Sequence, residues 1–179
     1  LKVIRNLESF PSPAFHPLVD SKNPRVLFHL LMALSKHGDP SWLPTVAFMA
    51  RDCKPGDVYL RHATIRALAG CDLEKDLGIF VVHRNPLVRL WSVVALRQLG
   101  SEKIVEFLQD SDRGIRTEAA RGIHDDFSID GAMPGLAQQL DSTNDQDANF
   151  MVRALNANFR LGGEACLNRI LKWIGDPSG

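Results

Sequence analysis

The residues best suited to chemistry are three consecutive ones, His124, Asp125 and Asp126. An imidazole beside a carboxylate can hold a metal ion that activates water for hydrolysis. Such a site would also need a separate histidine and a further aspartate, and His83 and Asp130 are candidates without any fixed spacing. The alternative is a helix C-terminus, where the histidine complements the helix dipole and the aspartates begin the next turn. We favour this structural interpretation and keep a metal-dependent hydrolase centred on His124 and Asp125 as an alternative hypothesis.

Other signatures of catalysis are missing from the sequence. It contains no GxxxxGK(S/T), GxSxG or GxGxxG motif, so neither a phosphate-binding loop nor a nucleophile elbow is predicted. The three cysteines, Cys53, Cys71 and Cys166, form no CxxC pair and indicate neither a zinc site nor a disulfide framework. We therefore predict no catalytic residue, no metal and no cofactor in this segment, which we expect not to be an enzyme.

The charge balance limits the classes of partner. Lysine and arginine total 21, aspartate and glutamate also total 21, and the net charge is zero. A nucleic-acid binder usually carries a basic excess because phosphate neutralisation drives its affinity. We therefore expect no nucleic-acid partner, and keep a helical nucleic-acid-binding module as a second alternative, which predicts a steep salt dependence. No apolar run reaches the ~18 residues of a membrane span, so none is expected in this segment.

A repeated pattern runs along the chain, at intervals of about 27 to 37 residues. Each copy has Asp or Asn, then Arg four residues later; the first three copies have a small residue six residues after the Arg, and the fourth has one, Ala157, four residues after it. The Asp or Asn is typical of a helix N-cap. The four pairs are Asp57 and Arg61, Asn85 and Arg89, Asp112 and Arg116, and Asn149 and Arg153. A second arginine row further along the same helices is the better candidate for a partner-facing surface: Arg66, Arg97, Arg121 and Arg160.

Apolar residues at three- and four-residue steps predict an all-α chain without strands. We expect helices over 24–37, 40–52, 58–69, 73–83, 86–99, 101–109, 113–124, 130–141, 146–161 and 163–174. Residues 1–22 should hold a remnant helix followed by a proline-rich loop or extended segment over residues 10–19, and residues 23–179 a single helical domain. Both ends have the character of cuts, so we expect a segment of a larger protein.

The helical hairpins resemble HEAT repeats over about residues 20–175. That resemblance implies a right-handed α-solenoid of about five hairpins, working as a scaffold for protein–protein or inter-domain interaction. In HEAT repeats the turn Asp and the helix Arg form a ladder between successive repeats. The resemblance therefore implies a ladder of the four Asp/Asn–Arg pairs. A first copy departs from the pattern at Leu27, where arginine is expected.

A narrower resemblance lies in two stretches of the second half. Residues 116–125 read R-T-E-A-A-R-G-I-H-D and residues 153–162 read R-A-L-N-A-N-F-R-L-G. They are similar to the HEAT region of the PVC-type haem-binding CxxCH proteins, also called putative membrane-bound dehydrogenases, which are typically exported bacterial proteins. The resemblance implies a periplasmic or exported oxidoreductase as the parent protein. This segment has no CxxCH and would bind its protein partner or neighbouring domains without its own haem.

Overall fold

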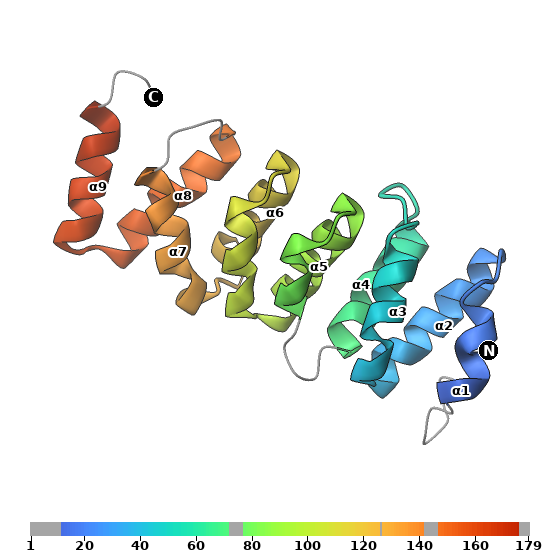
Figure 1. The fold of residues 1–179 in the computed structure, drawn as a ribbon. Helices are drawn as coiled ribbons and strands as arrows, with labels where there is room; N and C mark the ends of the chain where they lie inside the picture. The colour runs from blue at the N-terminus through green and yellow to red at the C-terminus, as the bar shows by residue number, and fades with distance from the viewer. Residues whose placement is uncertain (1–11, 72–76, 126, 142–146, 176–179) are drawn as a thin grey trace. The chain divides into compact units, whose positions relative to one another are not determined.

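A computed structural model describes residues 12–71, 77–125, 127–141 and 147–175 (Figure 1). The helices in these ranges are joined by short turns and no β-strand occurs among the described residues, so the prediction of an all-α chain is confirmed there. The chain divides into two compact units, residues 1–95 and 96–179, and the boundary falls inside helix α5. No helix of the described residues is long and apolar enough to cross a membrane.

The first unit contains seven helical elements and most of an eighth within its described residues. They are α1 (Ser12–Phe15), η2 (His16–Leu18), α2 (Pro24–His37), η3 (Pro40–Trp42), α3 (Leu43–Ala50), α4 (Val58–Cys71), η4 (Leu77–Val82) and α5 (Pro86–Leu99), where η marks a 3-10 helix. Helix α2 packs along α4, and α3 packs against α4 as well. Trp42 is buried in this core, and the indole of Trp91 donates to the carbonyl of Cys53 at 3.2 Å.

The contact between α2 and α4 depends on a missing side chain. A Cβ atom added at Gly70 of α4 would lie 2.3 Å from the backbone oxygen of Ser35 on α2. The two helix backbones therefore approach each other so closely at this point that only glycine fits without displacement.

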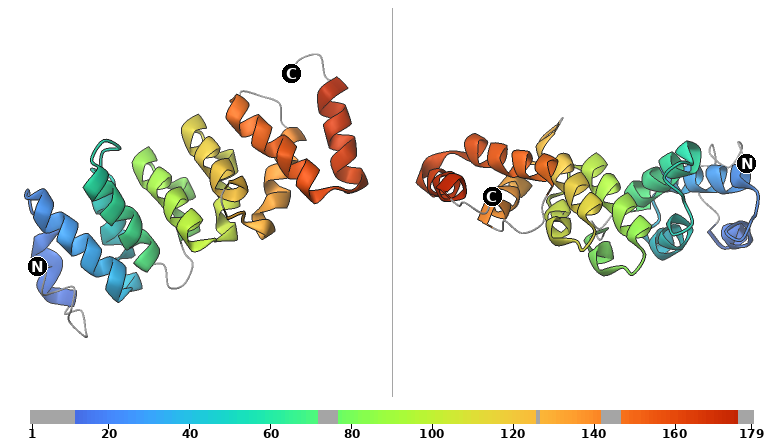
Figure 2. Two further views of the ribbon diagram at one scale, coloured as in Figure 1. Left: turned by 180° about the vertical axis from the view of Figure 1, so that it is seen from behind. Right: turned by 90° about the horizontal axis from the view of Figure 1, so that it is seen from above.

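The second unit contains the end of α5 and, in the order of the chain, η5 (Glu102–Gln109), α6 (Arg113–His124), η6 (Asp130–Ala132), α7 (Met133–Gln138), η7 (Gln139–Asp141), α8 (Ala148–Leu161) and α9 (Gly163–Gly175). Helix α6 packs against η5, α7 and α8, and α8 packs in turn against α7 and α9 (Figure 2). Small residues are fully buried where these helices meet, among them Ala119, Ala120, Ala154 and Ala157. Short side chains allow neighbouring helices to lie close together.

Most predicted helix boundaries agree with the structure. Helices α2, α5 and α6 have the predicted first and last residues. Their ends carry the expected caps: Asn23 accepts a hydrogen bond from the Arg25 amide at 3.0 Å, and Gly38 ends α2 with a φ of 58°.

Three expectations about local structure need correction. The helix expected over 101–109 is the 3-10 helix η5, which begins at Glu102, and both ends of the 130–141 segment are also 3-10 helix, not continuous α-helix. Residues 73–83 contain the 3-10 helix η4, and their first part lies outside the described residues. Residues 12–18 form α1 and η2 instead of a loop or extended segment, because Pro13 and Pro17 lie in first turns, where a proline costs no hydrogen bond. The predicted helix in residues 1–10 lies outside the described residues.

Candidate functional site

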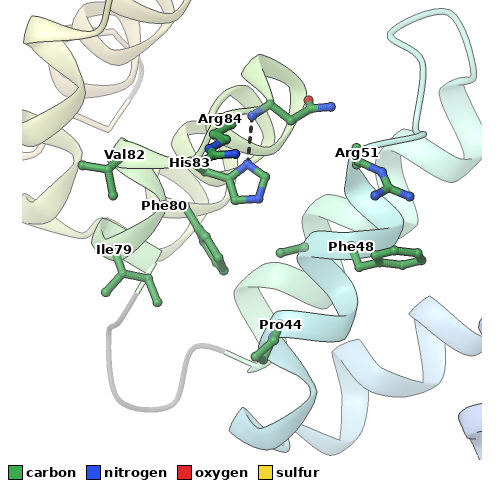
Figure 3. A pocket seen from close by; sticks show the side chains of 10 residues that line it. Pro44, Phe48, Arg51, Ile79, Phe80, Val82, His83 and Arg84 are labelled. Atoms are coloured by element: carbon green, nitrogen blue, oxygen red, sulfur yellow. Dashed lines mark hydrogen bonds between the residues drawn. The ribbon is translucent and has the colours of Figure 1, made fainter.

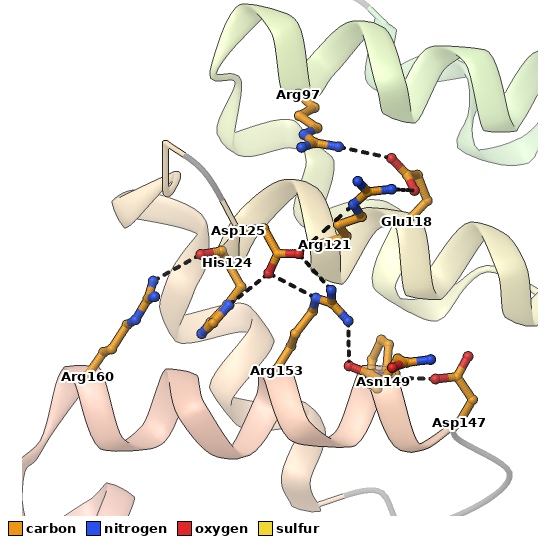
Figure 4. Close-up of polar contacts among 10 residues, drawn as sticks. Arg97, Glu118, Arg121, His124, Asp125, Asp147, Asn149, Arg153 and Arg160 are labelled. Atoms are coloured by element: carbon orange, nitrogen blue, oxygen red, sulfur yellow. Dashed lines mark hydrogen bonds and ion pairs between the residues drawn. The ribbon is translucent and has the colours of Figure 1, made fainter.

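His124 and Asp125, the pair kept as an alternative metal site, lie in a polar cluster between the end of α6 and the middle of α8 (Figure 4). Arg153 of α8 donates from Nε to Asp125 Oδ1 at 3.0 Å and from Nη2 to Asp125 Oδ2 at 2.6 Å. This is the two-pronged geometry in which a guanidinium binds a carboxylate most strongly. The bonds join residues 28 positions apart and hold α8 against the end of α6.

His124 completes the same arrangement. Its Nδ1 lies 3.0 Å from Asp125 Oδ1, and its buried Nε2 has no hydrogen-bond partner among the residues that the structure describes. The guanidinium of Arg160 donates to the backbone oxygen of His124 at 3.0 Å and so satisfies a carbonyl at the C-terminus of α6. Hydrogen bonds from Arg153 lower the pKa of Asp125 to about 2, against its burial, and the bond to His124 acts in the same direction.

The two oxygens of Asp125 therefore already accept hydrogen bonds from a guanidinium and an imidazole. The helix C-terminus that we expected at His124 is present, with Asp125 as the C-cap. His83 lies in the other unit, and its Nδ1 accepts from the Asn85 amide at 3.1 Å. Asp130 accepts from the Ser128 hydroxyl at 2.8 Å. Among the described residues, no three His, Cys, Asp or Glu side chains come together as a metal site.

Acidic residues along α6 and at the start of α8 extend the cluster. Glu118 binds Arg97 at 3.3 Å and Arg121 at 3.7 Å. Asp147 accepts a hydrogen bond from the Thr117 hydroxyl at 2.7 Å. We call this set of residues the α6–α8 brace; its members are Arg97, Thr117, Glu118, Arg121, His124, Asp125, Asp147, Arg153 and Arg160. Two of its ion pairs, Arg97–Glu118 and Arg153–Asp125, join different helices, which is the arrangement of a structural contact.

Three of the four repeated arginines bind the turn that precedes their own helix. Each guanidinium donates from Nη1 to the carbonyl two residues before the capping Asp or Asn: Arg61 to Pro55 at 2.9 Å, Arg89 to His83 at 2.8 Å and Arg116 to Asp110 at 2.8 Å. The capping side chains accept from amides of their own helices: Asp57 from Leu60, Asn85 from Leu87, and Asp112 from Gly114 and Ile115. These bonds clamp the turn and the first helical turn together. A ladder between successive repeats stays a prediction for these pairs.

The fourth pair differs from the expected pattern. Asp147 caps α8 by accepting from the Phe150 amide at 2.9 Å, whereas Asn149 lies inside the first turn of the helix. The assignment of Asn149 as the N-cap was therefore wrong, because the aspartate two residues earlier is placed to reach the free amide. Arg153 donates to the Asn149 carbonyl at 2.9 Å and carries the cross-helix bond to Asp125.

The arginine row expected to face a partner is largely engaged within the second unit. Arg97 and Arg121 bind Glu118, and Arg160 binds the His124 carbonyl. Arg121 still exposes half of its side chain, and Arg160 is exposed. Arg66 is exposed on α4 of the first unit.

Sequence reasoning missed an open apolar groove of about 720 Å³ in the first unit, between α3 and η4 (Figure 3). Helix η4 explains one wall. In a 3-10 helix, residues three apart lie above one another, so Ile79 and Val82 share a face. These side chains are 60% and 85% exposed, whereas Phe80 is buried. The opposite wall comes from α3, with Pro44 in its first turn and Phe48, which is 48% exposed.

Basic and donor groups border this groove. The Arg51 guanidinium stacks on the Phe48 ring at 4.2 Å from its centroid, and its Nη2 lies 3.4 Å from the exposed carboxylate of Asp52. Arg84 is exposed on the other side. His83 uses Nδ1 as an acceptor for the Asn85 amide, so a neutral His83 carries its proton on Nε2 and offers a donor. No acidic residue is among the described residues that line the groove.

In comparisons with known proteins, no family model matches this sequence and no curated protein matches it.

Proposed function

We propose that this chain is a non-catalytic helical-repeat scaffold of the HEAT kind, a right-handed solenoid of about five hairpins that binds a neighbouring domain or another protein. Two features of the second unit support this proposal. The most reactive-looking residues, His124 and Asp125, are tied into the brace between α6 and α8. In addition, an apolar helix face is left uncovered.

The observation that carries the proposal is a stripe of exposed apolar side chains on α9. Leu167, Leu171 and Ile174 are 54%, 57% and 68% exposed. Their spacing of four and three residues places them on one face of the helix. The buried side of α9 carries Cys166 and Ile170 and packs towards α8 and η7. Helix α9 is therefore apolar on the side facing its neighbours and also on a side that faces solvent.

Burial of this stripe by a partner would stabilise the complex by several kcal/mol. Burying a leucine or isoleucine side chain completely stabilises by about 1.5–3 kcal/mol, and each of these three still has about half of that to gain. In helical repeat proteins such faces are covered by the next hairpin or by a capping element. We propose a neighbouring helical hairpin or domain of the same longer polypeptide as the occupant.

Hydrogen exchange in the natural full-length protein tests this assignment. The amides of α9 should exchange more slowly there than in the isolated 179-residue chain. Leu171→Glu should remove that protection, because a carboxylate cannot be buried on the covered face without a large cost. Asn168→Glu, at an exposed polar position of the same helix, is the matched control and should preserve it. Equal exchange of α9 in both proteins would contradict the proposed docking.

The proposed parent is a larger exported bacterial oxidoreductase with a c-type haem, on the basis of the resemblance of residues 116–125 and 153–162. Haem would then be bound outside this segment. The visible absorption spectrum of the full-length protein should contain c-type haem bands, and the isolated segment should show none. If the full-length protein contains no haem, the proposal of an oxidoreductase parent is wrong, and the scaffold proposal is unaffected.

A further inference from the structure

We propose that the groove between α3 and η4 is a second docking site, which binds an acidic, apolar peptide segment of a partner protein. The inference concerns the first unit and does not depend on the α9 stripe. It is carried by the combination of an apolar groove with cationic and donor groups at its edge.

The apolar part of the groove favours aliphatic side chains of the bound peptide. Pro44, Phe48, Ile79 and Val82 present hydrocarbon to solvent over a volume of about 720 Å³. Such a volume lies within the usual range of binding clefts and holds several aliphatic side chains. The two walls come from helical elements within one compact unit, so the groove exists before any partner binds.

The edge of the groove favours negative charge on the bound peptide. The Arg51 guanidinium stacks on the Phe48 ring, and its Nη2 lies 3.4 Å from the exposed carboxylate of Asp52. Arg84 is exposed and makes no ion pair within the described part of the chain. Guanidinium groups bind carboxylates with paired, charge-assisted hydrogen bonds. A peptide with Asp or Glu beside its apolar residues is therefore complementary in both respects.

An acidic peptide fits these features better than a nucleic acid does. Binding of a phosphate backbone requires several lysine or arginine side chains in a row, and this chain has a net charge of zero. Proline, isoleucine and valine also suit aliphatic side chains, whereas stacking of bases depends on exposed aromatic rings. Of the two phenylalanines in the groove, Phe80 is buried and Phe48 is covered on one face by Arg51.

Two matched peptides test the proposal on the whole chain. Both are fluorescein-labelled amphipathic helices of about four turns, ~14 residues, with leucines at the same positions on one face. One carries glutamates on its polar face and the other carries lysines. By fluorescence anisotropy, the glutamate peptide should bind at least about tenfold more tightly, the change that one charge-assisted contact contributes.

Charge reversal then locates the site. Arg84→Glu should weaken the glutamate peptide by about tenfold and strengthen the lysine peptide, while Arg66→Glu, an exposed arginine of α4 outside the groove, should change neither appreciably. Ile79→Ser, on the exposed apolar wall, should weaken both peptides. Leu171→Glu on α9 should leave both affinities unchanged, which separates this site from the proposed docking of α9.

Three results would overturn the proposal. These are absence of binding by the glutamate peptide, equal affinity for the two peptides, or an unchanged affinity of the glutamate peptide in Arg84→Glu. Tighter binding of a single-stranded oligothymidylate, weakened by Arg84→Glu and by added salt, would assign the groove to nucleic acid instead.

Discussion

The close approach of α2 and α4 at Gly70 predicts the opposite of what a glycine-to-alanine change normally does in a helix. Alanine is favoured over glycine in a helix interior by about 1 kcal/mol. At Gly70, however, the new Cβ would lie 2.3 Å from the Ser35 oxygen and 2.6 Å from the Ser35 Cα, and these are backbone atoms that no rotamer change can move. Ordinary contacts begin at 3.4 Å, so the two helices would have to separate by about 1.1 Å, the difference between 3.4 and 2.3 Å. Overpacking of this kind costs about 1–3 kcal/mol.

Gly70→Ala should therefore lower the free energy of unfolding by a net of up to ~2 kcal/mol, after the helix-propensity gain is subtracted. Urea unfolding followed by circular dichroism measures this, and the Tm should fall by about 2–8 °C per kcal/mol, depending on how many residues unfold together. Gly56→Ala is the control, since a Cβ there meets nothing within 4 Å. It should be neutral or stabilise by up to about 1 kcal/mol. If Gly70→Ala is as stable as Gly56→Ala, α2 and α4 do not touch at this residue.

Three further predictions concern pH, thiol reactivity and packing. Asp125 has a pKa lowered to about 2, so its pairing stabilises the fold above its ordinary pKa of 3.8 and this contribution is lost as pH falls towards 2. Asp125→Asn should be less stable than the parent at neutral pH, and urea unfolding at a series of pH values should show the difference shrinking over that interval. Burial raises the pKa of Cys71 to about 12 and also raises that of Cys53, so both thiols should react with a disulfide reagent such as DTNB only when urea unfolds the chain; rapid reaction of the native chain would contradict their burial. Ala95→Trp, at a fully buried position of α5, should cost ~1–3 kcal/mol or more, whereas Gln98→Trp at an exposed position should cost little by the same unfolding measurement.

The helices that could be predicted from the sequence are those with local end signals. Helices α2, α5 and α6 each have an Asn or Asp that caps the first turn, and α2 and α5 also begin with a proline. These signals act within a few residues, so sequence alone locates them. The buried small residues Ala67 and Ala95 also have a local signal, because each lies six residues after the arginine of its repeat.

The elements that could not be predicted depend on contacts distant in the sequence. An apolar pattern with spacings of three and four does not distinguish a short α-helix from the 3-10 helix η5, because both place those residues on one face. The cap of α8 differs from the prediction because Asp147 and Asn149 are both good caps by type; Asp147 also accepts a hydrogen bond from the hydroxyl of Thr117, 30 residues earlier. The sequence carries one weak signal of the groove, the apolar pair Ile79 and Val82, which are three residues apart. This spacing places both side chains directly above one another only in a 3-10 helix, and both are exposed there.

The two surfaces proposed for docking differ in chemistry, and the difference predicts how each is used. The α9 stripe of Leu167, Leu171 and Ile174 is apolar, as in permanent interfaces, which resemble a protein core divided in two. The groove combines hydrocarbon with Arg51 and Arg84, and charged groups at an edge contribute more to the rate of association and to specificity than to permanence. An apolar interface that lacks its partner is exposed to water and promotes self-association of the chain. A groove with charged groups at its edge does so much less. The isolated chain should therefore self-associate in light-scattering measurements at high concentration, and Leu171→Glu should reduce this association while Arg84→Glu should not. Self-association that depends on Arg84 instead would mean that the groove, and not α9, is the face requiring a permanent cover.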